Sequence, residues 1–240
     1  FIVSLLQNKI MNRNEQCKTA ILIFANSSKE EVKHKLFIKD YNLFDTLTSR
    51  TFKTVKKSKL PYYHYSEKQQ KGNTFGERFT NAIQSVFDKG YDNVITIGND
   101  TPKLKASHLI EANHLLNKNK IVIGPSVDGG FYLMGINKLQ FNSNLFYNLP
   151  WQTSNLRKSL LNLIESNQNE VVSFLPILSD IDSIQDIKKL VNYTFILPKE
   201  LLVVFFLILN YSINWYKRVL LFFLYHFNSK VYNKGSPLLK

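Results

Sequence analysis

Short apolar runs alternate along the chain with longer stretches in which apolar residues recur at helical spacing. The runs are rich in β-branched and aromatic residues, which is typical of strands in a buried sheet. The expected strands cover residues 19–25, 61–66, 93–98, 120–124, 130–136 and 171–175.

Between these runs the sequence predicts helices. The clearest covers residues 74–90, where Thr74 and Glu77 form a capping box and Gly90 follows the last apolar residues. The other expected helices cover residues 30–58, 107–119, 154–166 and 183–191. Strands that alternate with helices in this way favour the α/β class with a mostly parallel central sheet.

A change in composition near Pro198 marks the start of an apolar tail, for which the pattern predicts helix over residues 198–227. Asn210, Asn214 and Lys217 share one helical face and interrupt the apolar run. The longest apolar stretch is therefore shorter than the ~20 residues that a membrane-spanning helix needs. Two interpretations stay open: peripheral contact with a membrane surface, or a helix buried on the domain or in a homodimer interface.

The formal net charge of +13 lies mostly at the two ends of the chain. Residues 1–60 carry 12 basic and 5 acidic side chains, and residues 199–240 carry 6 and 1, so the body between them is nearly neutral. A nucleic-acid-binding domain would carry its basic face in the folded body. We therefore expect no nucleic-acid partner, and a solvated surface or attraction to an anionic surface or substrate accounts for the charge.

Cys17 is the one cysteine of the sequence. It can form no disulfide within the chain, and a zinc site made of cysteines is excluded. The sequence fits a reducing compartment, and we expect the cytoplasm, with membrane association through the tail as the alternative. Residues 1–18 are interpreted as an N-terminal extension, of which 1–10 precede Met11 and lie upstream of the expected start.

An aspartate follows the apolar run 93–98 at the point where the expected strand ends. In open α/β sheets ligands bind beyond the carboxyl ends of the strands, which is where Asp100 is placed. Gly98 lets the backbone approach a ligand, and Pro102 stiffens the loop. A carboxylate is a hard oxygen ligand for Mg²⁺ or Mn²⁺. The alternative from this stretch alone is an aspartate that stabilises a turn.

Two further acidic loops follow expected strands. Asp128 precedes a pair of glycines and an aromatic strand, an arrangement that also occurs in simple hairpin turns. Asp180 and Asp182 are alternate residues, so an extended chain would project both to one side. Ser183 with Asp186 is expected to cap the following helix. Three acidic loops at strand junctions make a shared metal site a reasonable expectation.

The stretch from about residue 68 to 190 resembles the DUF2064 family, glycosyltransferase-A-like proteins related to sugar-nucleotide and cofactor nucleotidyltransferases. Five segments carry the resemblance, in the family's order: QQKGNTFGERFTNA (69–82), IGNDTPKL (97–104), GPSVDGGFYLMGI (124–136), LPWQTSNL (149–156) and DIDSIQDI (180–187). The resemblance implies a glycosyltransferase-A-like three-layer sandwich over residues 19–197 that binds a nucleotide or nucleotide-sugar donor, followed by the helical tail 198–240.

The resemblance also implies roles for individual residues. Asp100, with Asp180 and Asp182, would hold a Mg²⁺ or Mn²⁺ ion. Donor binding would involve Gly98 and Asp100, with Arg78 as a bidentate phosphate ligand and the basic pair Lys33 and Lys35. Asp128 is the expected acceptor contact or catalytic base. The expected lining of the acceptor pocket is Gly129, Gly130, Trp151 and Thr153.

One departure from the family pattern affects the expected activity. Related nucleotidyltransferases hold phosphates with a glycine-rich loop after the first strand, and residues 24–37 of this chain contain no glycine. This favours a metal-assisted transferase that uses an already activated nucleotide-sugar donor. The alternatives are a nucleotidyltransferase, or a binding protein that has lost catalysis and associates with a membrane.

Overall fold

The computed structural model describes residues 17–35, 38, 41–118, 120–165, 171–192 and 197–209. A six-stranded sheet forms its centre, with the strand order β2-β1-β3-β5-β4-β6. The strands are β1 (Thr19–Phe24), β2 (Tyr62–Tyr65), β3 (Asn93–Ile97), β4 (Lys120–Pro125), β5 (Phe131–Asn137) and β6 (Val171–Phe174). All six expected strands are confirmed, and each end lies within one residue of its predicted limit.

The sheet is mostly parallel, as predicted. β1 pairs in parallel with β2 and β3, and β4 pairs in parallel with β6. β5 is antiparallel to both of its neighbours, β3 and β4. The carboxyl ends of five strands and the amino end of β5 therefore meet at one edge of the sheet.

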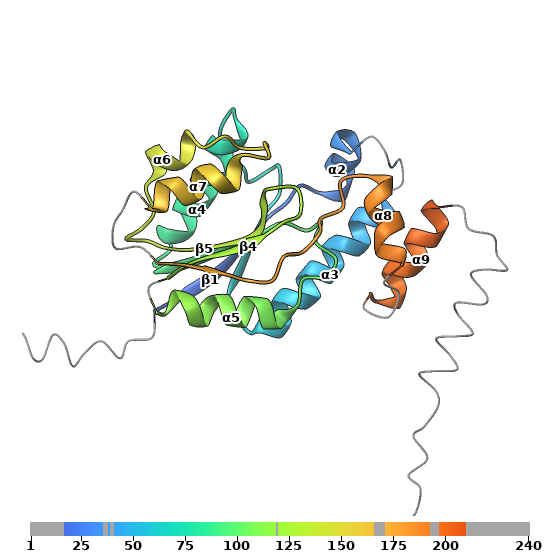
Figure 1. Cartoon of the computed structure of the whole chain (residues 1–240), viewed down its shortest axis with the longest axis horizontal. Coiled ribbons are helices and arrows are strands. Elements are labelled where there is room, and N and C mark those ends of the chain that lie inside the picture. Colours follow the sequence, from blue (N-terminus) through green and yellow to red (C-terminus); the bar gives the residue numbers. More distant parts are fainter. Residues whose placement is uncertain are drawn as a thin grey trace, which may run out of the picture.

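Helices cover both faces of the sheet (Figure 1). On one face lie α4 (Phe75–Phe87), α6 (Ser143–Tyr147) and α7 (Leu156–Glu165), and on the other lie α3 (Asn42–Ser58) and α5 (Ala106–Leu116). Alternate strand residues supply the two cores: Leu22 packs with Ile83 of α4, and Ile21 packs in the cluster that contains Leu109 of α5. The molecule is thus a three-layer α/β sandwich, and the expected fold class is confirmed.

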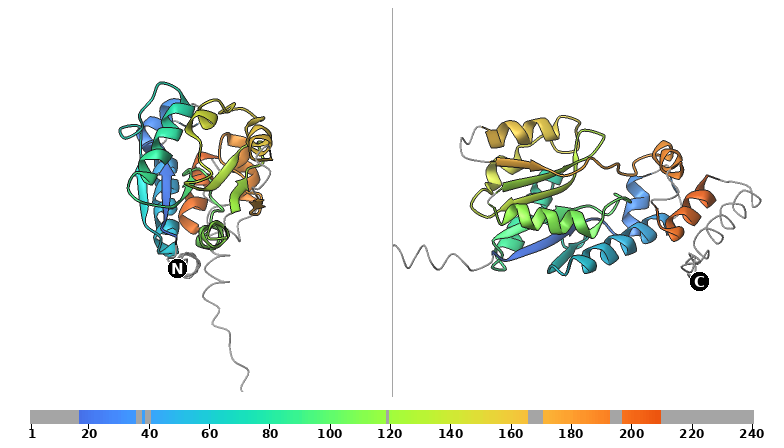
Figure 2. Two further views of the ribbon diagram at one scale, coloured as in Figure 1. Left: turned by 90° about the vertical axis from the view of Figure 1, so that its left-hand side faces the viewer. Right: turned by 60° about the horizontal axis from the view of Figure 1, so that its bottom comes forward.

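A third apolar cluster lies beyond the ends of the strands, as Figures 1 and 2 show. It joins the first turns of α3 to α8 (Ile184–Val191) and α9 (Lys199–Ile208). Leu43 of α3, Ile187 of α8 and Phe205 of α9 are all completely buried there. Contacts with α3 thus give α8 and α9 a fixed place beside the sandwich.

The helix predicted over residues 30–58 is wrong in its continuity. Two helices occupy this stretch, α2 (Ser28–His34) and α3, and Lys35 leaves the helical conformation with φ −101° and ψ 72°. None of the side chains of α2 is buried, whereas α3 buries Leu43, Phe44 and Leu47. The helical stripe in the sequence therefore belongs to α3 alone. The sequence also missed the short helix α6, which Asn142 caps.

The described part of the tail is helical, as expected, and packs on protein. Leu201, Leu202, Phe205 and Phe206 of α9 are buried in the third cluster, while Leu207 is exposed. Within the described residues no helix has the length and apolar character to cross a membrane. Residues 210–227 of the segment predicted to contact a membrane, 198–227, and residues 1–16 of the predicted extension 1–18 lie outside the described residues.

Candidate functional site

A cavity of about 570 Å³ opens at the edge where the strands end. Asn26 after β1, the segment 98–100 after β3, and Gly130 before β5 line it, together with Phe75 and Arg78 of α4. Its position follows from the topology, because parallel strands deliver the loops that follow them to a common edge. The reversal of β5 brings the preceding hairpin to the same edge.

The loop that carries Asp100 is fixed to α3. Asn99 donates a hydrogen bond to Thr48 Oγ1 at 2.9 Å, and Arg50 donates to the Pro102 carbonyl at 2.8 Å. A Cβ atom at Gly98 would lie 3.0 Å from Oδ1 of Asp100, so glycine lets the carboxylate fold back close to its own backbone. The stiff strand-end loop that the sequence predicts is thereby present, and its carboxylate faces the cavity.

Asp180 and Asp182 reach Asp100 because the chain after β6 continues along the sheet edge. The Leu178 amide donates to the Pro125 carbonyl at 3.1 Å, and the Ile181 amide donates to the Asp100 carbonyl at 3.0 Å. Both carboxylates line the cavity on either side of buried Ile181. The alternation of these residues in an extended segment thus places both on the cavity side.

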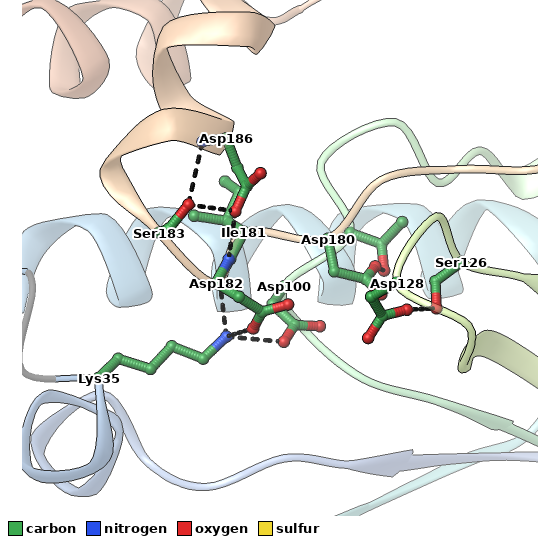
Figure 3. A network of polar contacts seen from close by, with 10 residues as sticks. Lys35, Asp100, Ser126, Asp128, Asp180, Ile181, Asp182, Ser183 and Asp186 are labelled. Atoms are coloured by element: carbon green, nitrogen blue, oxygen red, sulfur yellow. Dashed lines mark hydrogen bonds and ion pairs between the residues drawn. The ribbon is translucent and has the colours of Figure 1, made fainter. Parts of the chain in front are cut away.

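Lys35 links the segments that carry these carboxylates (Figure 3). Its Nζ lies 2.9 Å from Asp100 Oδ2 and 3.0 Å from Asp182 Oδ1, and it donates to the Ile181 carbonyl at 2.8 Å. Burial favours the neutral amine, but the two carboxylates outweigh it and raise the pKa of Lys35 well above its ordinary value. Lys35 is therefore a permanently charged ammonium in this site.

Asp180 is a largely buried carboxylate of the group. It accepts a hydrogen bond from Thr101 Oγ1 at 2.5 Å. Burial and the negative charges of Asp100, Asp182 and Asp128 raise its pKa to about 8, although the Thr101 hydrogen bond acts in the opposite direction. Near neutral pH the protonated acid is therefore the main form of Asp180.

Asp128 lies in the tight hairpin between β4 and β5. Its Oδ1 accepts hydrogen bonds from the Ser126 hydroxyl and from the Gly130 amide. Gly129 has a φ of 97°, and a Cβ atom there would lie 2.6 Å from the Ser154 carbonyl oxygen, so glycine is required. Asp128 and Gly130 line the cavity as predicted. Gly129, also a predicted pocket residue, lies outside the cavity lining and packs against the backbone of Ser154.

Aromatic rings form another part of the cavity wall. The Trp151 ring centroid lies 4.9 Å from that of Phe79 and 5.5 Å from that of Phe75, and its Nε1 donates to the Phe146 carbonyl at 2.7 Å. A Cβ atom at Gly76 would lie 2.6 Å from Trp151 Cδ1, so the ring needs glycine at that position. Thr153 also lines the cavity, and its hydroxyl donates to the Pro150 carbonyl at 2.7 Å.

The two remaining basic candidates differ in position. Arg78 lines the cavity, and its Nη1 donates to the Asn73 carbonyl at 3.3 Å. Lys33, a predicted donor-binding residue, lies outside the cavity lining, and its 69% exposed side chain pairs with Glu30 at 2.7 Å. The reason is the helical geometry of α2, which turns Lys33 to solvent, whereas Lys35 lies just past the end of the helix.

Several cavity residues were missed by the sequence. Asn26 lies two residues after the end of β1, so the strand-end argument that selects Asp100 would have selected it too. Glu31 and Tyr132 also line the cavity. Burial raises the pKa of both, with neighbouring Asp100 and Asp180 adding to the effect. No local pattern marks either residue, because Glu31 lies in a charged stretch and Tyr132 in an apolar strand.

A divalent ion in this cavity would need several hard oxygen ligands in an open arrangement. Among the described residues, no group of three or more His, Cys, Asp or Glu side chains is arranged to hold a metal ion. Asp100 and Asp182 both face the Lys35 ammonium instead. With Lys35 in this position, the arrangement does not fit a divalent ion.

Comparison with known proteins agrees with this fold. The model of the family described as DUF2064, an uncharacterized protein conserved in bacteria, matches residues 47–153. The match contains three of the five segments on which the resemblance rests and the start of a fourth, and ends before residues 180–187. No curated protein matches the chain.

Two solved structures share the architecture. A protein from Desulfovibrio desulfuricans G20, described as a "putative nucleotide-diphospho-sugar transferase", is 22% identical, covers 74% of this chain and 88% of its own, and has a TM-score of 0.62. Rv0371c from Mycobacterium tuberculosis H37Rv is 10% identical, covers 73% and 98%, and has a TM-score of 0.51. The resemblance to DUF2064 is thus confirmed over residues 47–153, and the chain shares the fold of the Desulfovibrio structure.

Proposed function

We propose that the protein is a transferase that moves a sugar, or a similar group, from a nucleoside diphosphate donor to a small or lipid-linked acceptor. The observation that carries this proposal is the convergence of Asp100, Asp128, Asp180 and Asp182 with Lys35 and Arg78 on one cavity. The cavity lies where α/β folds bind their ligands, and its volume lies within the ~300–1,000 Å³ typical of small-molecule sites. The single Cys17 fits the cytoplasm as the proposed location.

The basic side chains suit the diphosphate of the donor. Arg78 presents a planar guanidinium that can donate two parallel hydrogen bonds to phosphate oxygens. Lys35 supplies a compact positive charge at the carboxylate end of the cavity. Arg78 would bind the diphosphate and stabilise its charge as it leaves, while Lys35 offsets the negative charge of Asp100 and Asp182 beside it.

The aromatic wall suits the flat apolar face of a base or a sugar ring. Trp151, Phe75 and Phe131 lie side by side on the cavity surface and are held by contacts with one another. Aromatic faces combined with a few convergent polar groups are typical of sites for small ligands. Trp151 would therefore set the orientation of the group to be transferred.

Asp128 is the proposed base. Its carboxylate is exposed to the cavity and is oriented by Ser126 and Gly130. In the proposed step the acceptor hydroxyl oxygen forms a bond to the anomeric carbon, the bond from this carbon to the diphosphate oxygen breaks, and the acceptor proton moves to Asp128. The diphosphate leaves with the electron pair of the broken bond.

The loop after β1 favours a transferase over a nucleotidyltransferase. The Ser27 amide donates to Glu67 Oε2 at 2.8 Å, and the Ser27 hydroxyl donates to Glu67 Oε1 at 3.0 Å. A loop that cradles the phosphates of a nucleoside triphosphate would instead turn its amides toward an anion from the ligand. In this chain a carboxylate of the protein already accepts that hydrogen bond.

The proposed reaction includes no step through a metal ion. The predicted ligands Asp100, Asp180 and Asp182 do line one cavity, but Lys35 and Thr101 are their partners. The chemistry proposed above uses side chains of this chain alone.

The test is calorimetric titration of the full chain with UDP-, GDP-, CDP- and ADP-sugars, with the exposed variant Lys29→Met as control. We expect one donor to bind, Arg78→Met to weaken it at least ~10-fold through loss of two charge-assisted hydrogen bonds, and Lys29→Met to bind as the wild type does. A folded wild-type protein that binds none of the four would contradict the proposal.

Turnover then separates an enzyme from a protein that only binds. Release of nucleoside diphosphate from the bound donor, measured with a panel of sugar and lipid acceptors, should be abolished or reduced ~10²–10⁴-fold in Asp128→Asn, since a general base contributes a factor of that size. Donor binding that is never followed by release, with any acceptor, would favour the binding protein.

A further inference from the structure

The surroundings of the Lys35 ammonium resemble those of a metal ion. Three oxygen atoms lie within 3.0 Å of its Nζ: one from each carboxylate of Asp100 and Asp182, and the carbonyl oxygen of Ile181. Carboxylates and a backbone carbonyl are also the ligands that a hard divalent cation takes. The close-up in Figure 3 shows the Lys35 side chain, which begins just past the end of α2, reaching the carboxylates of Asp182 and Asp100.

The position of Lys35 is unusual for a lysine. Its side chain is 16% exposed, although lysine is rarely buried unless it is paired. It follows a short helix that itself buries no residue, so packing of α2 does not explain why this side chain turns inward. The attraction of Asp100 and Asp182 explains the inward turn of Lys35, because a cation beside two neighbouring carboxylates offsets their repulsion.

Other basic groups near the cavity have different partners. His34 lies 3.5 Å from Glu30, and Arg78 donates to the Asn73 carbonyl. The carboxylates of Asp100 and Asp182, among the described residues, both pair with Lys35. The positive charge at the carboxylate end of the cavity is therefore that of Lys35.

We propose that Lys35 is a built-in cation that takes the place of a divalent metal ion, so that the cavity binds the donor diphosphate without added metal. Lys35 excludes the ion because both would need the same carboxylate oxygens. The exclusion of metal follows from the contacts alone, whereas the statement about the diphosphate rests on the proposed function.

The first test measures Mn²⁺ binding by the full chain in the absence of any nucleotide, through the loss of the electron paramagnetic resonance signal of free Mn²⁺. Lys35→Met removes the charge and keeps an unbranched apolar chain. We expect this variant to bind one Mn²⁺ at least ~10-fold more tightly than the wild type, since it frees two carboxylates for the ion. Lys35→Arg and Lys29→Met, which keep a cation at the site, should match the wild type.

A folded Lys35→Met variant that binds Mn²⁺ no more tightly than the wild type does would overturn the inference. Circular dichroism confirms that each variant is folded. If Lys35→Met does not fold, the Mn²⁺ affinities of the wild type and of Lys35→Arg test the inference instead. Tight binding of one Mn²⁺ to either would show that a cationic side chain does not exclude the ion, and weak binding to both supports the inference.

The second test measures donor binding in EDTA and in Mn²⁺. Wild-type affinity should be equal in the two conditions, whereas Lys35→Met should bind the donor only with Mn²⁺. Loss of wild-type donor affinity in EDTA would overturn the inference. Because the first test contains no nucleotide, a failure of the proposed function, in which no donor binds, is distinguishable from a failure of the metal-exclusion proposal.

Discussion

Thr101 donates a hydrogen bond to the carboxylate of Asp180, at a distance of 2.5 Å across 79 positions of sequence. The hydrogen bond acts against burial and the negatively charged neighbours, which raise the pKa of Asp180 to about 8. The protonation state of Asp180 should therefore affect the free energy of unfolding.

The free energy of unfolding should carry a pH dependence due to Asp180. Because its folded pKa of about 8 exceeds the ordinary 3.8, the native chain retains a proton that the unfolded chain releases. The stabilisation is complete below about pH 4 and is lost as the pH rises to about 8. Between pH 5 and 8, urea unfolding should show a fall at least about 1 kcal/mol larger for the wild type than for Asp180→Asn.

Thr101→Val supplies the control for this prediction. The hydrogen bond from Thr101 lowers the pKa of Asp180, so its loss should raise that pKa further and extend the fall in stability to higher pH. Equal pH profiles for the wild type and Asp180→Asn would show that Asp180 titrates as an ordinary carboxylate.

Gly76→Ala should displace Trp151. The new methyl group would lie 2.6 Å from Trp151 Cδ1, which is closer than two carbon atoms can approach. Overpacking of this kind costs about 1–3 kcal/mol in urea unfolding, and donor affinity should fall with it. In a Trp151→Phe background the same change should cost less, because the smaller ring can move aside. Equal costs in both backgrounds would place the strain elsewhere.

Glu67→Gln should loosen the loop between β1 and α2. The charged acceptor for the Ser27 amide and hydroxyl is lost, which should lower stability by about 1 kcal/mol at pH 7. The hydrogen bond from the Ser27 amide lowers the pKa of Glu67, so its contribution is present above pH 4.5 and disappears as the pH falls. Urea unfolding at pH 7 and 3.5 checks both statements, with the exposed Glu111→Gln as the matched control.

Phe205→Ala should cost about 3–5 kcal/mol, the usual cost of truncating a buried aromatic side chain. Phe205 is completely buried against α3 and α8, whereas Leu207, two residues further along the same helix, is 68% exposed. Leu207→Ala should change the free energy of unfolding by about 0.5 kcal/mol or less. Similar costs for both substitutions would mean that α9 is not docked on α3 in solution.

Local pattern was sufficient to predict the six strands and the position of Asp100, but not the break between α2 and α3 or the short helix α6. The run NVITI is apolar and β-branched, and the aspartate after it lies at the sheet edge, as the rule for parallel strands predicts. The capping box of Thr74 and Glu77 and the Ser183 cap are also confirmed, because a cap depends on residues within one turn.

Relations between distant segments were beyond the sequence. Nothing near Lys35 in the chain indicates that it meets Asp100 and Asp182, since those partners are 65 and 147 positions away. The same holds for α9, whose apolar residues fit a membrane surface as well as they fit the α3–α8 groove that buries them. Such outcomes depend on which surfaces the folded chain offers, and composition does not specify them.

The contact between Lys35 and Asp182 also bears on how the protein is made. A ribosome adds Asp182 147 positions after Lys35 and after all six strands of the sheet. Chains that end between β6 and residue 182 would contain every strand of the sheet but lack one partner of Lys35. The edge of the sheet that lines the cavity is therefore completed only after synthesis of the sheet itself has ended.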